Sequence, residues 1–321
     1  MAGSVRLRNA ATIALKEYLG LAEEESLLVV CDEGLREIGI ILYECGKKLC
    51  TEAMYVEMKQ REFNGQEPPE SIAQMMQQVD AVICPTSKSI THTKARRDAS
   101  KLGVRVATMP GITVSTMVRC MNADHEQIVE LTNKVAERLK KVKQIRIETS
   151  LGTNVTLPIS KRKILSSTGV LRNIGESGNL PSGEVYLAPW EEKTNGTVVF
   201  DGSIAGIGLL RNPIKVQLKN GYIEKIEGKS EAKDFEELLG KVGFRDAKAV
   251  AEFGIGTNYK AKLTGDILED EKVLGTVHMA FGNNMSMGGI ISVQSHIDGL
   301  IKEPTVFFDD EMVMKAGKLL F

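Results

Sequence analysis

The chain has 321 residues, with 41 basic and 42 acidic side chains and a formal net charge of −1. This balance gives no reason to expect a nucleic acid or an anionic membrane as partner, and no apolar run approaches the roughly 20 residues of a membrane-spanning helix. The five cysteines are odd in number and form no C-x-x-C pair. These features predict a cytoplasmic protein without a disulfide framework or a thiolate zinc knuckle.

The first half of the sequence alternates expected helices and strands. Strands separated by crossover helices imply a parallel sheet, in which ligands lie beyond the carboxyl ends of the strands. Residues 1–145 therefore predict a Rossmann-like α/β domain. Helices are expected over residues 6–19, 34–49, 68–78, 93–103 and 124–142, and strands over residues 26–32, 51–58, 81–86 and 104–110.

A serine- and threonine-rich loop, residues 84–97, joins an expected strand to an expected helix. Its hydroxyl side chains can cap the helix. The loop also lies at the carboxyl end of a parallel strand, where ligands bind in such sheets. Ser87 and Lys88 are therefore candidate substrate-binding residues. His92 is a candidate catalytic residue.

Beyond residue 145 the pattern changes to strands and glycine turns, which predicts a strand-rich α+β domain over residues 146–321. The Asn220-Gly221 pair between two alternating runs indicates a hairpin. One helix is expected, over residues 231–242. Strands are expected within residues 143–159, 183–189, 196–204 and 214–228.

Four strand segments in the second half carry solitary ionisable residues within apolar runs. In the segment QSHIDG, His296 and Asp298 lie on the same strand face, with α carbons about 6.6 Å apart. His278, Glu252 and Glu184 stand out from apolar neighbours in the same way. A buried charge needs a partner, and one metal site would partner all five.

Nitrogen and oxygen ligands without sulfur suit Zn²⁺, Mn²⁺, Co²⁺ or Fe²⁺. Five such groups would suit two ions bridged by one carboxylate. Ordinary ion pairing is the alternative, because a His-x-Asp pair is often a simple ion pair and Lys272 or Lys260 could neutralise a buried glutamate. Neither a nucleotide-binding glycine motif nor a G-x-S-x-G elbow is present.

The same segments resemble a known family. GNLPSGEVYLAP, EFGIGTN, ILEDEKVLGTVHMAFGNN and SHIDGLIKEPTVFFDD occur in order between Asn179 and Asp310, and they resemble the thermophilic metallo-aminopeptidases of the aminopeptidase T type. This resemblance implies a homodimeric two-metal exopeptidase with a Rossmann-like domain and a strand-rich metal-binding domain. The implied metal ligands are Glu184, Glu252, His278, His296 and Asp298, with Glu252 as the bridging carboxylate.

One motif departs from that family. The peptidases carry a tyrosine in the glycine-rich stretch after the first histidine, whereas GNNMSMGG, residues 282–289, contains none. Met285 stands at about the position of that tyrosine. The same superfamily includes an iron-dependent ring-opening enzyme, 2,5-dihydroxypyridine dioxygenase, so the scaffold does not fix the chemistry.

The leading hypothesis is a metal-dependent hydrolase that removes N-terminal residues from small peptides, with one or two ions of Zn²⁺, Co²⁺ or Mn²⁺ activating a water. Glu184 or Glu252 would shuttle the proton. The first alternative is an Fe²⁺-dependent dioxygenase acting on a small hydroxylated ring, for which two histidines and one carboxylate suffice. The second is a non-catalytic relative that binds a small ligand or a partner and no metal.

Overall fold

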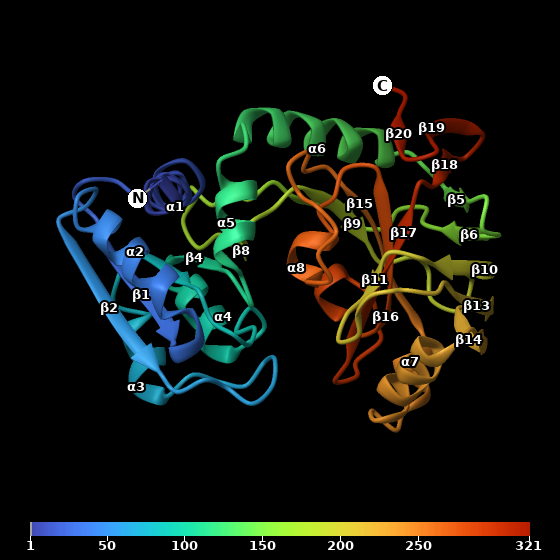
Figure 1. Ribbon diagram of the computed structural model, residues 1–321, viewed down its shortest axis with the longest axis horizontal. Coiled ribbons are helices and arrows are strands. Elements are labelled where there is room, and N and C mark those ends of the chain that lie inside the picture. Colours follow the sequence, from blue (N-terminus) through green and yellow to red (C-terminus); the bar gives the residue numbers. More distant parts are fainter. Residues whose placement is uncertain (1) are drawn as a thin grey trace. The chain divides into compact units, whose positions relative to one another are not determined.

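The computed structural model describes residues 2–321, with side chains from Val5 onward. It combines one parallel sheet with two sheets of antiparallel pairing, and helices border all three (Figure 1). The predicted α/β class is thereby confirmed. The chain packs as two compact units, Met1–Val129 with Ser167–Ser182 and Glu130–Ser166 with Gly183–Phe321. The division into two domains, residues 1–145 and 146–321, stays a prediction.

The first unit is built on a five-stranded sheet in the order β2-β1-β3-β4-β8. Its central strands are continuous buried apolar runs, as expected where helices cover both faces of a parallel sheet. The strands are β1 Ser26–Asp32, β2 Glu52–Met58, β3 Ala81–Cys84, β4 Arg105–Thr108 and β8 Ser177–Asn179, and the helices are α1 Ala2–Ile13, α2 Arg36–Gly46, α3 Glu70–Met75, α4 Lys94–Lys101 and α5 Val114–Met121.

Two elements of this unit were not predicted. Helix α5 begins after Thr113, whose side chain accepts a hydrogen bond from the backbone of Thr116. Strand β8 comes from the second half of the sequence and pairs in parallel with β4. It is only three residues long, so hydrophobic periodicity gives no signal for it.

The second unit contains two sheets that share one hydrophobic core. Ile147 and Val216 of the first sheet and Phe253 and Met279 of the second belong to the same buried cluster, so the sheets pack face to face. The first sheet has the order β14-β13-β10-β6-β5-β18-β19-β20 and the second has the order β12-β11-β17-β16-β15-β9-β7.

The elements of this unit are mostly strands, as predicted for the second half of the sequence. The predicted hairpin is β13–β14, which turns at Asn220 and Gly221, both at positive φ. The helices are α6 His125–Leu139, whose residues up to Val129 belong to the first unit, α7 Ser230–Gly240 and α8 Ile267–Asp270. The strands are β5 Gln144–Glu148, β6 Asn154–Pro158, β7 Leu165–Ser167, β9 Glu184–Leu187, β10 Asn195–Phe200, β11 Ser203–Ile204, β12 Gly208–Leu209, β13 Ile214–Lys219, β14 Tyr222–Glu227, β15 Val250–Gly256, β16 Thr276–Gly282, β17 His296–Lys302, β18 Thr305–Phe308, β19 Glu311–Lys315 and β20 Lys318–Leu319.

Within the described residues, no helix combines the length and the apolar character needed to cross a membrane. The expected cytoplasmic location and the expected homodimer stay predictions.

Candidate metal centre

The five predicted ligand residues lie on four adjacent strands of the seven-stranded sheet, β9, β15, β16 and β17. Side chains alternate faces along a strand, and the registers place all five on the same face. Glu252 pairs with Ala280, which in turn pairs with Asp298. The opposite face carries the apolar side chains of the core between the two sheets.

Small residues beside the ligands make room for them. His278 is paired with Gly254, Glu184 with Gly256, and His296 with Gly282. A Cβ atom on Gly254 would lie 2.1 Å from Nε2 of His278, a separation that real structures do not tolerate. The glycine therefore allows the imidazole to lie flat across the neighbouring strand.

Glu252 is the centre of the cluster. Its Oε1 lies 3.3 Å from Nε2 of His278, and its Oε2 lies 3.0 Å from Nε2 of His296. His296 Nε2 is also 3.5 Å from Oδ1 of Asp298, and His278 Nε2 is 3.6 Å from Oε2 of Glu184. His278 is fully buried, while the His296 side chain is 31% exposed and forms the open edge of the cluster.

These contacts shift the proton affinities of the cluster strongly. Burial would raise the pKa of Glu252, but hydrogen bonds from His278 and His296 outweigh burial and lower that pKa to about 2. Burial would lower the pKa of His278, but its hydrogen bond to Glu252 and the charge of Glu184 raise that pKa to about 9. Burial also opposes a charged His296, yet the carboxylates of Asp298 and Glu252 raise its pKa well above the ordinary value. The cluster thus requires positive charge, which protons or a divalent ion can supply.

Two residues outside the predicted ligand set complete the cluster. Lys272 is fully buried, and its Nζ lies 2.8 Å from Oε1 of Glu184 and also contacts the carboxylate of Glu271. Burial raises the pKa of Glu271 to about 8, although the Lys272 charge opposes the shift. The ion pair anticipated for a buried glutamate therefore exists beside the cluster. Glu271 was missed because it stands in an acidic run, Glu269 to Glu271, where no single carboxylate is distinctive.

His296 is oriented from behind by a backbone group. Its Nδ1 donates a hydrogen bond to the carbonyl oxygen of Asn283 at 2.7 Å, which leaves Nε2 facing the carboxylates. Metal-binding histidines are commonly held in this way, because the second nitrogen then fixes the tautomer. Sequence periodicity could not reveal the role of Asn283, because its backbone carbonyl and not its side chain contacts His296.

The loop from Asn283 to Ser295 is clamped by a buried ion pair between Arg162 and Glu191, whose side chains are 7% and 10% exposed. One oxygen of Glu191 accepts hydrogen bonds from the side chain of Asn284 at 2.9 Å and from the backbone of Ile290 at 3.1 Å. Arg162 also donates to the carbonyl of Ala188. The clamp fixes the segment that holds His296.

The donor atoms fit a divalent ion. They form two groups, Glu252 with His296 and Asp298, and Glu184 with Glu271 and His278, and within each group the atoms lie within 4.8 Å of one another. Imidazole nitrogen and carboxylate oxygen suit first-row divalent metals. Among the described side chains, His278 Nδ1 is buried without a hydrogen-bond partner. The absence of a side chain at Gly254 leaves the space that the His278 imidazole occupies.

The other predicted site residues lie in the first unit. Ser87 binds the carboxylate of Asp32 through both its backbone nitrogen and its hydroxyl group, at 2.5 and 2.8 Å. Lys88 is half-buried and His92 is exposed in the loop before α4. Thr93 caps that helix, as the loop composition predicted. Roles for Ser87, Lys88 and His92 in substrate binding or catalysis stay predictions.

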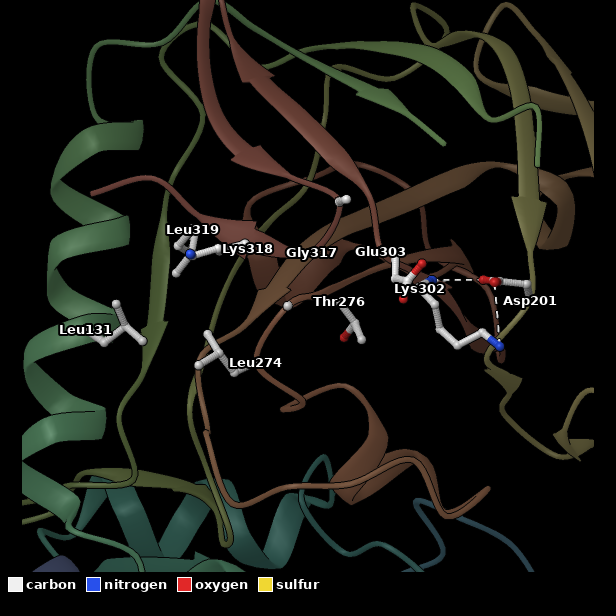
Figure 2. Close-up of a pocket in the computed structure, with 11 residues that line it drawn as sticks. Leu131, Asp201, Leu274, Thr276, Lys302, Glu303, Gly317, Lys318 and Leu319 are labelled. Carbon is white, nitrogen blue, oxygen red and sulfur yellow. Dashed lines mark hydrogen bonds and ion pairs between the residues drawn. The ribbon is translucent and has the colours of Figure 1, made fainter. Parts of the chain in front are cut away.

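A separate cavity of about 790 Å³ opens at the far end of the same strands (Figure 2). Thr276 and Lys302 form the last pair of the β16–β17 ladder, whereas Gly282 and His296 form the first. His278 of the cluster lies two strand steps, roughly 7 Å, from Thr276. None of the cluster residues lines the cavity. Its lining residues are Leu131, Asp201, Leu274, Gly275, Thr276, Lys302, Glu303, Ala316, Gly317, Lys318 and Leu319.

Comparison with known proteins favours one of the two enzymatic hypotheses. A model of the 2,5-dihydroxypyridine 5,6-dioxygenase family matches residues 34–321 and so includes every residue of the cluster. A curated 2,5-dihydroxypyridine 5,6-dioxygenase from Pseudomonas putida KT2440 is 22% identical over 196 residues, which cover 57% of this chain. The match spans about half of that relative, 55% of its length.

Two solved structures share the fold. A 2,5-dihydroxypyridine dioxygenase from Pseudomonas putida KT2440 superposes with a TM-score of 0.85 at 17% identity, over 99% of this chain and 97% of the other. Wild-type AmpT from Thermus thermophilus superposes with a TM-score of 0.72 at 16% identity, over 98% of this chain and 99% of the other. The resemblance to aminopeptidase T is confirmed for the fold.

The predicted aminopeptidase activity is wrong, as are the hydrolase and proteolysis classes that came with it. The family model and the curated relative are both described as a 2,5-dihydroxypyridine 5,6-dioxygenase. The segments quoted for the peptidases lie within the fold that this chain shares with both solved structures. The absence of the peptidase tyrosine at Met285 was the sequence feature that pointed away from peptide hydrolysis.

Proposed function

The chain belongs to the 2,5-dihydroxypyridine 5,6-dioxygenase family, and from this premise we propose that it is an Fe²⁺-dependent dioxygenase that opens a small hydroxylated nitrogen-containing ring. The observation that carries the proposal is the placement of His278 and His296 on the two oxygens of Glu252, beside Asp298. Two histidines and a carboxylate are the ligand set of non-heme iron oxygenases.

The ion would be held by His278, His296 and the carboxylates of Glu252 and Asp298. Bound ferrous iron supplies the one-electron chemistry that allows O₂ to react with an aromatic ring. Imidazole and carboxylate ligands are also compatible with Zn²⁺, Co²⁺ or Mn²⁺, so the preference for iron rests on family membership.

The chain's own residues orient and enclose this centre. The Asn283 carbonyl keeps Nε2 of His296 directed at the carboxylates. The core behind β15 and β16 excludes water from the face opposite the ligands. The clamped loop also presents exposed apolar side chains, with Met285 53% exposed and Ile290 78% exposed. We assign this loop to contact with the planar substrate.

Oxygen uptake tests the proposal. Metal-free protein is loaded anaerobically with Fe²⁺ and mixed with 2,5-dihydroxypyridine in aerated buffer, while dissolved oxygen and ring absorbance are followed. The expected result is consumption of about one O₂ per ring lost, as dioxygenation requires, with no reaction for the Zn²⁺-loaded protein. Iron-loaded protein that leaves both O₂ and the ring unchanged would contradict the proposal.

A further inference from the structure

A smaller pocket, of about 350 Å³, lies in the first unit beside helix α4. Its lining residues are Arg96, Arg97, Ser100 and Lys101 of α4, together with Gly175, which lies just before β8. Three of these five residues are cationic and none is acidic. The pocket therefore concentrates positive charge, which attracts anions.

Arg96 carries a half-buried charge that is held by neutral partners only. Its Nε donates a hydrogen bond to the carbonyl oxygen of Thr91 at 2.7 Å, and its Nη1 donates to the hydroxyl group of Ser177 at 2.9 Å. The remaining N–H groups of the guanidinium have no acceptor among the described residues. Burial and then the charge of Arg97 lower the pKa of Arg96, as expected for a cation without an anion beside it.

The acidic residues next to the lining residues in the sequence are engaged elsewhere. Asp98 pairs with Lys94 and Lys101. Glu176 accepts hydrogen bonds from the backbone and side-chain nitrogens of Asn173 at 2.9 and 2.7 Å. Among the described side chains, no carboxylate forms an ion pair with either arginine of the pocket. Because buried charges are normally paired, the pocket lacks an anion that the chain itself does not supply.

Ser100 contributes a second unsatisfied group. Its Oγ is buried and has no hydrogen-bond partner among the described residues. The backbone beside it is closely packed, since a Cβ on Gly175, which is at φ +76°, would lie 2.5 Å from the carbonyl oxygen of Ser100. Buried hydroxyl groups are normally hydrogen-bonded, and an anion in the pocket would supply the missing acceptor.

We propose that this pocket binds the phosphate group of a small molecule. The guanidinium fork matches the oxygens of a phosphate, and three cations favour a dianion over the single charge of a carboxylate. The free N–H groups of Arg96, the side chains of Arg97 and Lys101, and the Ser100 hydroxyl group are the donors. None of them belongs to the metal cluster, so the inference does not depend on the proposed function.

Bound phosphate should also stiffen the loop before α4. Arg96 donates to the carbonyl oxygen of Thr91, and Nη1 of Arg97 donates to that of His92. An anion that fixes both guanidinium groups therefore fixes both of these contacts. Amide hydrogen exchange over residues 87–93 should slow when phosphate binds.

Calorimetric titration of the whole chain with inorganic phosphate tests the site, with chloride holding the ionic strength constant. The expected stoichiometry is one phosphate per chain. Arg97→Gln and Lys101→Gln, both at exposed positions, should each weaken binding by about 10-fold, because each removes a charge-assisted hydrogen bond. Lys94→Gln removes a cation of the same helix that does not line the pocket, and it should bind phosphate like the wild type.

Phenyl phosphate in place of inorganic phosphate identifies the source of the anion. Tighter binding of phenyl phosphate indicates an organic phosphate, and equal or weaker binding indicates the free ion; both support the site. Failure of both anions to bind would overturn the inference. Phosphate bound with unchanged affinity by Arg97→Gln and Lys101→Gln would overturn it as well, because the anion would then lie elsewhere. So would binding that leaves amide exchange over residues 87–93 unchanged.

Discussion

Gly254 and His278 face one another across the β15–β16 pair, and the glycine has no side chain because the imidazole occupies that space. A Cβ at residue 254 would lie 2.1 Å from Nε2 and 2.2 Å from Cε1 of His278. The position of the candidate ligand His278 on β16 therefore depends on the absence of a side chain at Gly254 on β15.

Replacing Gly254 with alanine should therefore weaken metal binding. The added methyl group forces the His278 ring to move, and we expect a loss of metal affinity of about 10-fold or more, as for residues that orient ligands. Overpacking should also lower the free energy of unfolding by about 1–3 kcal/mol. Calorimetric titration with Mn²⁺ and urea denaturation measure the two effects.

The matched control is Gly240→Ala at the end of α7, where a Cβ would meet no atom within 4 Å. It should leave metal affinity unchanged. If Gly254→Ala bound metal as tightly as this control, His278 would not belong to the metal centre.

The four strands that carry the candidate ligands were predictable because alternation along a strand is a local property. His278 stands alone between Val277 and Met279, and His296 and Asp298 are two residues apart, so periodicity alone gives their common face. The register that brings them to Glu252 is not local. It depends on the pairing of β15 with β16 and of β16 with β17.

Glu271 shows why the rest could not be predicted, and Lys272 was anticipated only as one of two lysines that could neutralise a buried glutamate. They reach the site on a loop that passes over Gly256, and nothing in the sequence around Glu184 indicates which lysine will pair with it. The reaction was harder still, because a fold does not determine a reaction, and this fold is shared by a solved 2,5-dihydroxypyridine dioxygenase and by AmpT. The single residue that hinted at the difference was Met285.

Replacing Glu191 with glutamine should loosen the loop that orients His296. The substitution leaves the buried guanidinium of Arg162 without its carboxylate, and breaking such a pair costs about 3 kcal/mol of stability. Metal affinity should fall by about 10-fold, because Asn283 no longer holds the imidazole firmly. Amide hydrogen exchange over residues 283–295 should rise. Glu192→Gln, at the exposed neighbouring position, should change none of these.

The Arg36–Glu57 pair predicts a pH-dependent contribution to stability. Hydrogen bonds from Arg36 and then from Tyr55 lower the pKa of Glu57 to about 2, against about 4.3 in an unfolded chain. A carboxyl group with a depressed pKa stabilises the fold above its unfolded pKa, and the benefit disappears as pH falls through the folded pKa.

The difference in free energy of unfolding between wild type and Glu57→Gln should therefore be constant above about pH 5.5 and shrink steadily toward about pH 2. Urea denaturation across this range measures the difference. Glu52→Gln, exposed at the start of the same strand, controls for removal of a strand carboxylate. A gap for Glu57→Gln that did not shrink in acid would refute the assignment.

Replacing His296 with alanine should abolish metal binding. His296 is one of the two histidines of the cluster and faces both Glu252 and Asp298, so its loss removes an imidazole ligand of the kind that suits first-row divalent metals. Elemental analysis after dialysis should find about one equivalent of iron in the wild type and almost none in the variant. His125→Ala, in helix α6, should retain the wild-type content. Iron retained by His296→Ala would place the ion elsewhere.

The most direct test of an Fe²⁺-dependent ring-opening activity is the fate of labelled oxygen. Iron-loaded protein is mixed with 2,5-dihydroxypyridine under isotopically labelled O₂ in unlabelled water, and the product is analysed by mass spectrometry. A ring-opened product carrying both atoms of one O₂ molecule is the predicted result. An unchanged ring, or a product whose new oxygen comes only from water, would contradict the account.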